Sequence, residues 1–326
     1  MIENNKPKLI IGFITYGQAT APYLPYFLPS LIKQCTECKI LVIDNTEKED
    51  NDNAKYIKSN YPEIDFSWAG SNLGFAQAYN LIISQAVAEK AEYFLMINPD
   101  MLLEDGCLNK LTEIMDRNKY LGSASPKVLH WDFVNNQKTK MIDTCGIQMK
   151  PGLRFIDLGQ SQMDKGQFDL HPILGPSGCA GLYRLSALED IKIEGKYFDE
   201  LFFMYKEDVD LSYRLHLAGW KSELISQAII YHDRTASGKG ESIFNIIFSR
   251  KLKSQKVKQW SFFGQQILFY KFWLLQNLWQ KINIISYQLK MYVFILIFER
   301  YLFDEFKKIK KIKQIIKEKR KLIKVK

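Results

Sequence analysis

The sequence has few cysteines and histidines, which limits the metal and redox chemistry that it can support. Among 326 residues there are 5 Cys and 4 His. A structural zinc site usually needs four such ligands, and the one closely spaced pair, Cys35 and Cys38, has no second pair and no nearby histidine. An odd number of scattered cysteines favours a reducing compartment. We therefore expect Cys35 and Cys38 to be a coincidental pair at the end of a helix.

Long hydrophobic runs are also lacking. The longest wholly apolar run, residues 291–298, is far shorter than the roughly 18 residues typical of a membrane-spanning helix. Residues 1–8 are polar and lead directly into an apolar segment, which is not the pattern of a secretory signal peptide. Both features favour a cytoplasmic protein without a spanning helix.

Acidic residues are scarce near the end of the chain. Residues 250–326 hold 20 basic and only 4 acidic side chains, whereas residues 1–249 hold 25 basic and 32 acidic ones. The net charge of +9 thus combines an acidic body with a strongly basic tail. Such a segment favours contact with a polyanion, either a membrane surface or a nucleic acid.

The tail has the composition of an amphipathic helical segment. Aromatic and aliphatic residues dominate from about Trp260, and residues 306–326 alternate lysines with Ile and Leu. An apolar face opposed by lysines is typical of a helix in the membrane interface. The alternative is an appendage that packs on the body or on a second subunit. Because no nucleic-acid motif accompanies the charge, we predict a body over residues 1–245 and, over residues 246–326, a tail on an anionic membrane surface.

Short apolar runs alternate with amphipathic stretches in the first half of the chain. The predicted buried strands are residues 9–15, 40–43, 64–68 and 93–97. With helical stretches between them, this order predicts an α/β fold with a doubly wound, mostly parallel sheet. Ligands bind at the carboxyl ends of such strands, where the sequence places Thr15, Asp44 and Asp100.

Two of these carboxylates suit a nucleotide. Asp44 can accept hydrogen bonds from a ribose hydroxyl or a base imide, or it can cap a turn or helix. Asp100 ends the triplet Asn98-Pro99-Asp100, which can be a plain turn. Its carboxylate can also bind a hard divalent cation that bridges two phosphates.

A dense acidic cluster, Glu207, Asp208 and Asp210, opens a predicted helix. The three side chains cannot all point the same way. One can serve as a general base while the others cap the helix or organise neighbours. A solvated acidic helix N-terminus is the alternative, and the apolar residues 201–205 just before the cluster weigh against it.

His232 ends another apolar run and is followed by Asp233 and Arg234. A neutral imidazole can ligate the same cation as Asp100, and Arg234 with Lys239 can take up phosphate charge. A histidine at the end of a strand is more often only structural.

These motifs are weak one by one, but their order and spacing are specific. The chain resembles the family 2 inverting glycosyltransferases with the GT-A fold, and within them the rhamnosyltransferase-like branch. The resemblance covers roughly residues 8–240. Its matching segments are Ile14-Thr15-Tyr16, Val42-Ile43-Asp44-Asn45, Asn72-Leu73-Gly74-Phe75-Ala76, Asn98-Pro99-Asp100, Gly178-Cys179-Ala180-Gly181, Phe198-Asp199-Glu200, Tyr205-Lys206-Glu207-Asp208-Val209-Asp210 and Tyr231-His232.

The resemblance implies a role for each segment. Asp208 would be the general base, with Glu207 as the fallback, and Asp100 with His232 would hold Mg²⁺ or Mn²⁺. The donor nucleotide sugar would contact Thr15, Tyr16, Asp44, Asn72, Gly74, Phe75, Asn98 and Arg234. The acceptor side would include Gly178, Cys179, Ala180 and Asp210.

Two positions depart from the family pattern. Asn98 replaces the first Asp of the usual Asp-x-Asp metal motif, which removes one negative charge from the site. Lys206 stands where a small residue is common, which can alter the preference for donor or acceptor.

The resemblance implies an inverting transferase that moves a sugar, rhamnose being one candidate, from a nucleoside diphosphate to a saccharide or lipid-linked acceptor. Such a protein would take part in cell-surface polysaccharide or glycolipid assembly at the inner face of the cell membrane. A polyprenyl-phosphate sugar synthase and a non-catalytic nucleotide-sugar-binding scaffold are the alternatives. We also expect a chain cut before about Trp260 to keep donor binding while losing membrane contact.

Overall fold

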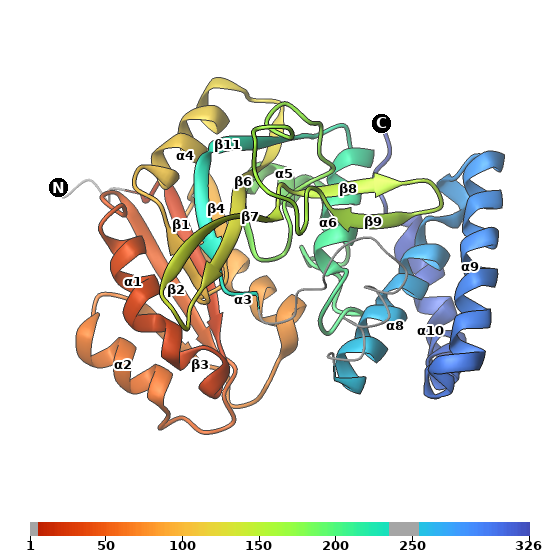
Figure 1. The fold of residues 1–326 in the computed structure, drawn as a ribbon, viewed down its shortest axis with the longest axis horizontal. Helices are drawn as coiled ribbons and strands as arrows, with labels where there is room; N and C mark the ends of the chain where they lie inside the picture. The colour runs from red at the N-terminus through yellow and green to blue at the C-terminus, as the bar shows by residue number, and fades with distance from the viewer. Residues whose placement is uncertain (1–5, 235–253) are drawn as a thin grey trace.

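The computed structural model describes residues 6–234 and 254–326. Its centre is a nine-stranded sheet in the order β3-β2-β1-β4-β10-β6-β11-β5, with β7 paired to β6 (Figure 1). The predicted boundary between body and tail, at residues 245 and 246, lies outside the described residues, and so does Lys239.

One half of the sheet is parallel, as predicted. It consists of β1 (Leu9–Thr15), β2 (Cys38–Asp44), β3 (Asp65–Trp68) and β4 (Tyr93–Ile97). The strands β1 and β4 have the predicted bounds, because each is an apolar run buried on both faces by helices.

Helices cover both faces of this half. Its strands are connected by α1 (Leu24–Ile32), α2 (Asp52–Asn60) and α3 (Gly74–Ala88), and α4 (Cys107–Arg117) follows the last of them. The helices α1 and α4 pack on one face and α3 packs on the other. An apolar core thus lies on each face of the sheet. Because the four strands are parallel, their carboxyl ends lie at one edge of the sheet.

The other half of the sheet is mixed. The strand β10 (Ala180–Arg184) runs antiparallel to both β4 and β6 (Leu121–Asp132). Beyond β6, the strand β11 (Lys221–His232) is parallel to β6 and antiparallel to β5 (Met101–Leu103). A mixed α/β sheet with a helical C-terminal region is thus the observed form of the predicted fold class.

The remaining elements complete the fold. They are β7 (Gln137–Thr144), the hairpin of β8 (Ile147–Lys150) and β9 (Arg154–Asp157), α5 (Leu185–Ile191), α6 (Glu207–Leu217) and the short 3₁₀ helices Gly17–Ala19, Ala21–Tyr23, Trp273–Leu275 and Arg300–Leu302.

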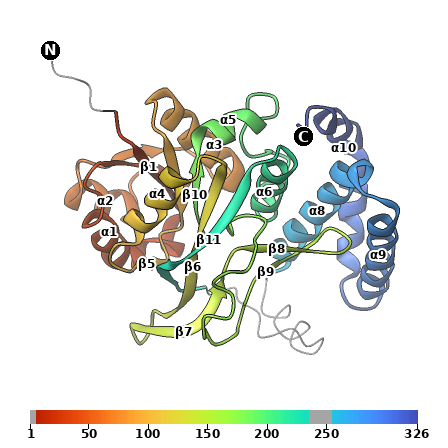
Figure 2. The same cartoon turned by 90° about the horizontal axis from the view of Figure 1, so that it is seen from above.

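The C-terminal region forms three helices beside α6 and the β8–β9 hairpin. They are α8 (Gln255–Phe272), α9 (Leu278–Phe298) and α10 (Phe303–Lys321), drawn in blue in Figures 1 and 2. Val209 and Tyr213 of α6 share one apolar core with Leu268 and Phe272 of α8 and with residues of α10. The helices α8 and α10 therefore pack on the body, the alternative that the sequence left open.

Buried ion pairs strengthen this packing. The Nζ atom of Lys271, on α8, lies 2.7 Å from Oδ2 of Asp199 and 2.6 Å from Oδ1 of Asp210. From α10, Nζ of Lys319 lies 3.0 Å from Oδ1 of Asp199. Because uncompensated buried charges are costly, these pairs tie the tail to the body electrostatically as well as by apolar contact.

The helix α9 is the exposed member of the three. It is long and apolar enough to cross a membrane by length and composition, with a mean hydropathy of 1.3 and 11% of its most apolar 18-residue window buried. Uninterrupted apolar runs do not reveal this helix, because Gln, Asn and Lys interrupt its sequence. However, α8 and α10 contact each other, with rings of Phe262 and Phe306 5.3 Å apart. A spanning α9 would separate them.

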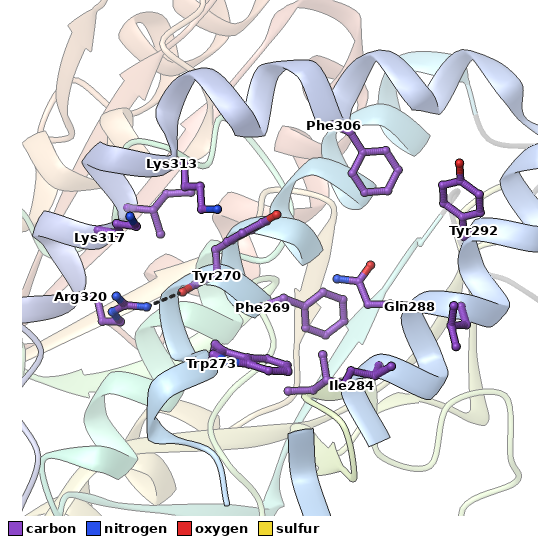
Figure 3. Close-up of a pocket in the computed structure, with 13 residues that line it drawn as sticks. Phe269, Tyr270, Trp273, Ile284, Gln288, Tyr292, Phe306, Lys313, Lys317 and Arg320 are labelled. Atoms are coloured by element: carbon purple, nitrogen blue, oxygen red, sulfur yellow. Dashed lines mark hydrogen bonds between the residues drawn. The ribbon is translucent and has the colours of Figure 1, made fainter. Parts of the chain in front are cut away.

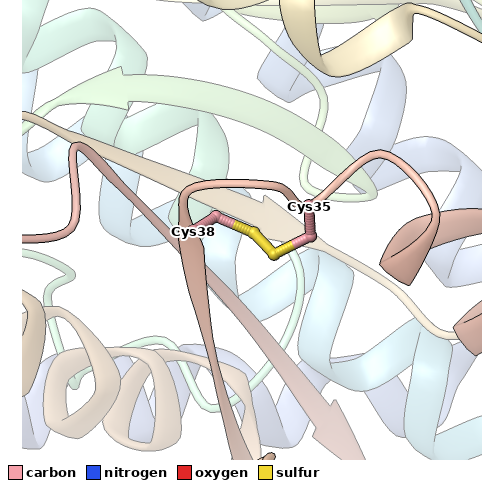
Figure 4. Close-up of a disulfide and its surroundings, with 2 residues drawn as sticks. All are labelled: Cys35 and Cys38. Carbon is pink, nitrogen blue, oxygen red and sulfur yellow. A yellow bond between two sulfur atoms is a disulfide. The ribbon is translucent and has the colours of Figure 1, made fainter.

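Cys35 and Cys38 form a disulfide in the turn between α1 and β2 (Figure 4). This finding differs from the coincidental, reduced pair expected from sequence. The other three cysteines are free and buried.

Candidate active site

One wall of the candidate site is built around His232 at the end of β11. Its Nε2 lies 3.2 Å from Oδ2 of Asp100, and its Nδ1 lies 2.7 Å from Oδ2 of Asp143. Burial lowers the pKa of His232, but Asp100 and the other neighbours raise it well above its ordinary value. The imidazole therefore bridges the carboxylate of Asp100, in the bend that follows β4, and that of Asp143 in β7.

The pair Asp100 and His232 fits a divalent cation. Oδ1 of Asp100 is buried and has no hydrogen-bond partner among the described residues. Two ligand atoms at right angles around an octahedral ion, each about 2.1 Å from it, lie about 3 Å apart, which is close to the observed spacing of 3.2 Å. A carboxylate that holds the second nitrogen of a ligating histidine, as Asp143 does, is common in metal sites.

A second possible ligand set is Asp143, Cys179 and His232, whose ligand atoms lie within 4.8 Å of one another. It suits a hard ion less well. Asp143 already engages His232 and Arg234, whose Nη1 lies 3.0 Å from Oδ1 of Asp143. Burial raises the pKa of the Cys179 thiol, and thiolates favour softer metals than Mg²⁺ or Mn²⁺.

The candidate base Asp208 lies at the start of α6. Its Oδ2 accepts a hydrogen bond from the backbone N–H of Gly178 (2.8 Å), and its Oδ1 accepts one from the N–H of Val209 (2.8 Å). A Cβ at position 178 would lie 3.2 Å from Oδ2 of Asp208. Glycine therefore leaves room for the carboxylate. Burial raises the pKa of Asp208, and Lys206 opposes this effect.

The neighbouring Glu207 has a different environment. Its side chain is buried, and Oε2 has no hydrogen-bond partner among the described residues. Burial raises its pKa well above the ordinary value for a glutamate. Burial therefore disfavours the ionised form that a base needs, which makes Glu207 a poorer candidate than Asp208.

Short contacts join the wall around His232 to the candidate base Asp208. Gly178 holds Asp208, the next residue Cys179 approaches His232, and the carbonyl of Cys179 accepts a hydrogen bond from the N–H of Asn98 (2.8 Å). The loop before β10 therefore links the metal-type pair to the candidate base. Ala180 is buried within this strand and pairs with Ile97.

On the donor side, Asp44 is fully buried. Its carboxylate accepts hydrogen bonds from Thr15 Oγ1 (2.9 Å), Thr46 Oγ1 (2.6 Å) and Asn51 Nδ2 (2.6 Å). Both oxygens are thus engaged by the protein, and Asp44 organises the loops after β1 and β2. The ring of Tyr16, the next residue after Thr15, is 39% exposed and available for stacking.

The segment that begins α3 closes this side of the site. The Oδ1 of Asn72 accepts a hydrogen bond from the N–H of Gly74 (2.9 Å), and the N–H of Phe75 donates to the carbonyl of Phe203 (2.8 Å). Gly74 has φ +73°, and a Cβ there would lie 2.5 Å from the carbonyl oxygen of Phe203. Glycine is therefore required for the two loops to meet.

Two predicted site residues serve mainly structural contacts. Asp210, expected on the acceptor side, is buried between Arg214 (2.7 Å) and Lys271, because it lies two residues beyond Asp208 and faces the protein interior. Arg234, expected to bind phosphate, bonds Asp143 and Asp157, each at 3.0 Å. Arg234 lies beside the candidate site, but the carboxylates of Asp143 and Asp157 already neutralise its charge.

Asp143 is a member of the candidate site that the sequence did not single out. It lies in β7 with no exposed surface. Arg234 and His232 outweigh the effect of burial and hold its pKa well below the ordinary value. The available signal was a single carboxylate within the apolar stretch Met141-Ile142-Asp143-Thr144-Cys145.

Comparison with known proteins agrees with this geometry. The family model described as glycosyl transferase family 2 matches residues 11–192, more than half of the chain. The chain belongs to glycosyl transferase family 2. It is therefore a glycosyltransferase, as its motif order predicts.

Two curated relatives of this family 2 enzyme are rhamnosyltransferases. An N-acetylglucosaminyl-diphospho-decaprenol L-rhamnosyltransferase of Mycobacterium tuberculosis is 27% identical over 252 residues, covering 70% of this chain and 77% of that protein. The rhamnosyltransferase WbbL of Escherichia coli K12 is 27% identical over 255 residues, covering 75% and 90%. These similarities confirm the likeness to the rhamnosyltransferase branch.

Among solved structures, GalNAc-T7 with UDP, GalNAc and Mn²⁺ matches with a TM-score of 0.51 and 12% identity, covering 81% of this chain and 51% of that one. The chain thus spans about half the length of that structure. The likeness confirms the GT-A fold.

Proposed function

We propose that this family 2 glycosyltransferase moves a sugar, with rhamnose as the first candidate, from a nucleoside diphosphate to a hydroxyl of a saccharide on a lipid diphosphate carrier. The relatives support this choice, because both are named rhamnosyltransferases and one is named for an N-acetylglucosaminyl-diphospho-decaprenol. Such a reaction belongs to cell-surface polysaccharide or glycolipid assembly, at the inner face of the cell membrane.

One observation carries the proposal: a candidate base and a candidate cation site share one loop. Gly178 bonds Asp208, and Cys179 lies against His232, which bridges to Asp100. An acceptor hydroxyl at Asp208 can thus lie close to a diphosphate at Asp100.

The residues suit an inverting displacement. The carboxylate of Asp208 takes the proton of the acceptor hydroxyl, whose oxygen attacks the anomeric carbon from the face opposite the leaving group. The bond from that carbon to the diphosphate oxygen breaks, and the nucleoside diphosphate leaves with the electron pair. The hydrogen bonds from Gly178 and Val209 hold the carboxylate in the orientation that proton transfer needs.

Asp100 and His232 would hold the divalent cation, Mg²⁺ or Mn²⁺. When bound there, the cation supplies positive charge that stabilises the leaving diphosphate. Asp143 keeps the ring of His232 oriented through Nδ1, and Tyr16 offers an exposed ring to the base of the nucleoside. Arg234 keeps Asp143 ionised rather than binding phosphate itself.

The test uses the purified full chain with an acceptor that carries N-acetylglucosamine on a short lipid diphosphate. Turnover with a dTDP-, UDP- or GDP-sugar is expected for one nucleotide class. Asp208→Asn should abolish turnover while leaving the donor-induced rise in Tm unchanged, because the base contacts the acceptor rather than the nucleotide. Asp116→Asn, at a partly exposed carboxylate of α4 that pairs with Lys8 and Tyr93, is the matched control. Full turnover by Asp208→Asn would contradict the assignment.

A further inference from the structure

A cavity of about 550 Å³ lies between α8, α9 and α10 (Figure 3). Its walls are aromatic and aliphatic and include Phe269 of α8, Trp273 just beyond it, and Ile284 and Leu289 of α9. This volume lies within the range of roughly 300–1,000 Å³ that is typical of sites for organic ligands.

One side of the cavity is positively charged. Lys313, Lys317 and Arg320 line it from α10, where spacings of four and three residues place them on one helix face. No lining residue is acidic. Within the described chain none of the three forms an ion pair, whereas three other lysines of α10 pair with acids of their own helix. The cavity therefore combines an apolar interior with uncompensated positive charge.

The surface beside the cavity is apolar as well. On α9 the side chains of Ile285, Leu289 and Tyr292 line the cavity and are at least half exposed. The same helix exposes Ile297 (61%) on another face. The basic group of Arg320 remains against α8, with Nη1 3.2 Å from the carbonyl of Tyr270. With α8 and α10 joined in this way, α9 can lie along a membrane surface with the cavity opening beside it.

We propose that this cavity binds one anionic phospholipid of the membrane. An acyl chain would lie among the aromatic side chains, and the phosphate would lie against Lys313, Lys317 and Arg320. Basic side chains form charge-assisted hydrogen bonds with a phosphate. Burial of an acyl chain in an apolar interior is favoured by the hydrophobic effect.

A bilayer phospholipid fits this cavity better than the lipid-linked acceptor of the reaction. Gly264, on the same helix as Phe269, packs against Tyr205 and Lys206, just before the candidate base. At 100° per residue, the five residues from Gly264 to Phe269 turn by about 140°, so the two lie on different faces of α8. The cavity and the segment before Asp208 therefore contact different faces of this helix. The site is an anchor, distinct from the catalytic cleft.

Native mass spectrometry of the full chain with short-chain phosphatidylglycerol or phosphatidylcholine tests the proposal. One bound phosphatidylglycerol is expected, with about tenfold lower occupancy by phosphatidylcholine. In the variant Lys313→Gln/Lys317→Gln/Arg320→Gln, the occupancy by phosphatidylglycerol should fall about tenfold or more. The control Lys290→Gln/Lys307→Gln/Lys311→Gln removes the same charge from exposed positions of α9 and α10 that do not line the cavity, and it should keep the occupancy by phosphatidylglycerol.

A second pair of variants tests the apolar part. Ile285→Trp fills the cavity and should lower lipid occupancy, whereas Ile297→Trp, at another exposed isoleucine of α9, should not. The proposal would be overturned by an equal fall in phosphatidylglycerol occupancy in both charge variants, or by equal binding of the two lipids. Full lipid occupancy in Ile285→Trp would overturn it as well. Tighter binding of a polyprenyl diphosphate, with displacement of phosphatidylglycerol, would overturn the choice of a bilayer lipid. Glycosyl transfer is not needed for these readouts, so either proposal can fail alone.

Discussion

At the scale of single residues, the candidate site depends on a chain of buried charged side chains that contact one another. His232 lies between Asp100 and Asp143, and Asp143 in turn binds Arg234. Each member fixes the orientation of the next, so a change at Asp143, which would contact neither donor nor acceptor, should reach the cation site.

Asp143→Asn is therefore expected to weaken the cation site without removing a ligand. Outer partners of a ligating histidine are typically worth about 10- to 100-fold in metal affinity or activity. The measurement is the Mn²⁺ concentration for half-maximal turnover, which should rise by about this factor, together with Tm. Asp116→Asn is the control. An unchanged Mn²⁺ requirement in a folded Asp143→Asn protein would show that Asp143 has only a structural role.

The two neighbouring acids at the start of α6 should differ in their response to pH. The pKa of Asp208 is raised by burial, and a general base acts in its ionised form. Thus kcat/KM should rise with pH through a pKa above the ordinary value of about 3.9 and then level off. Burial raises the pKa of Glu207 well above its ordinary value, which disfavours the ionised form that a base needs. Glu207→Gln should therefore leave the acid limb in place, and loss of that limb in Glu207→Gln would make Glu207 the base.

At the scale of elements, α6 and α8 are joined by charge in the protein interior. Lys271 balances Asp199 and Asp210, and Lys319 of α10 adds to the same cluster. Burial raises the pKa of Asp199, but Lys271 and Lys319 outweigh that effect and lower it well below its ordinary value.

Lys271→Met should cost about 3–5 kcal/mol of unfolding free energy, because it leaves two buried carboxylates without their partner. Lys290→Met, at an exposed lysine of α9, is the control. Since the folded pKa of Asp199 is lowered, its stabilising effect is present above about pH 3.9 and is lost as the pH falls toward the folded value. Denaturant unfolding at pH 7 and in acid should show the two proteins converging in acid. Equal stability at pH 7 would contradict this role.

The shared core changes the expectation for a shortened chain. The sequence predicts that a chain cut before about Trp260 keeps donor binding. In the structure that cut would expose Val209 and Tyr213 and leave Asp199 and Asp210 without Lys271. We expect the shortened chain to unfold at lower temperature and to lose the donor-induced rise in Tm. A stable, donor-binding fragment would instead support an independent tail.

At the scale of the whole molecule, the sequence predicted the parallel half of the sheet and the segments that meet at its edge. Apolar runs such as residues 9–15 and 93–97 mark strands buried on both faces, and this signal is local. The antiparallel insertion of β10 between β4 and β6 was not predictable, because the pattern of a buried strand does not encode its partner or direction.

In the candidate site, too, the residues marked by a local sequence pattern were predictable and those that depend on a distant partner were not. Asp100, Asp208 and His232 follow or end apolar elements and were predictable from position. Asp143 was missed because its partner His232 is 89 residues away in sequence. Similarly, Lys271 gave the tail a charge that suggested solvent or lipid, whereas its partner Asp199 lies 72 residues earlier.

The most direct test of the central claim is release of the nucleoside diphosphate by the full chain, measured with each donor, with and without acceptor, Mn²⁺ and EDTA. The account predicts release for one nucleotide class, dependent on acceptor and cation, lost in Asp208→Asn and weakened in Asp100→Asn. Release that persists in EDTA and in Asp100→Asn would contradict the cation site. No release with any donor and acceptor would contradict the proposed transfer.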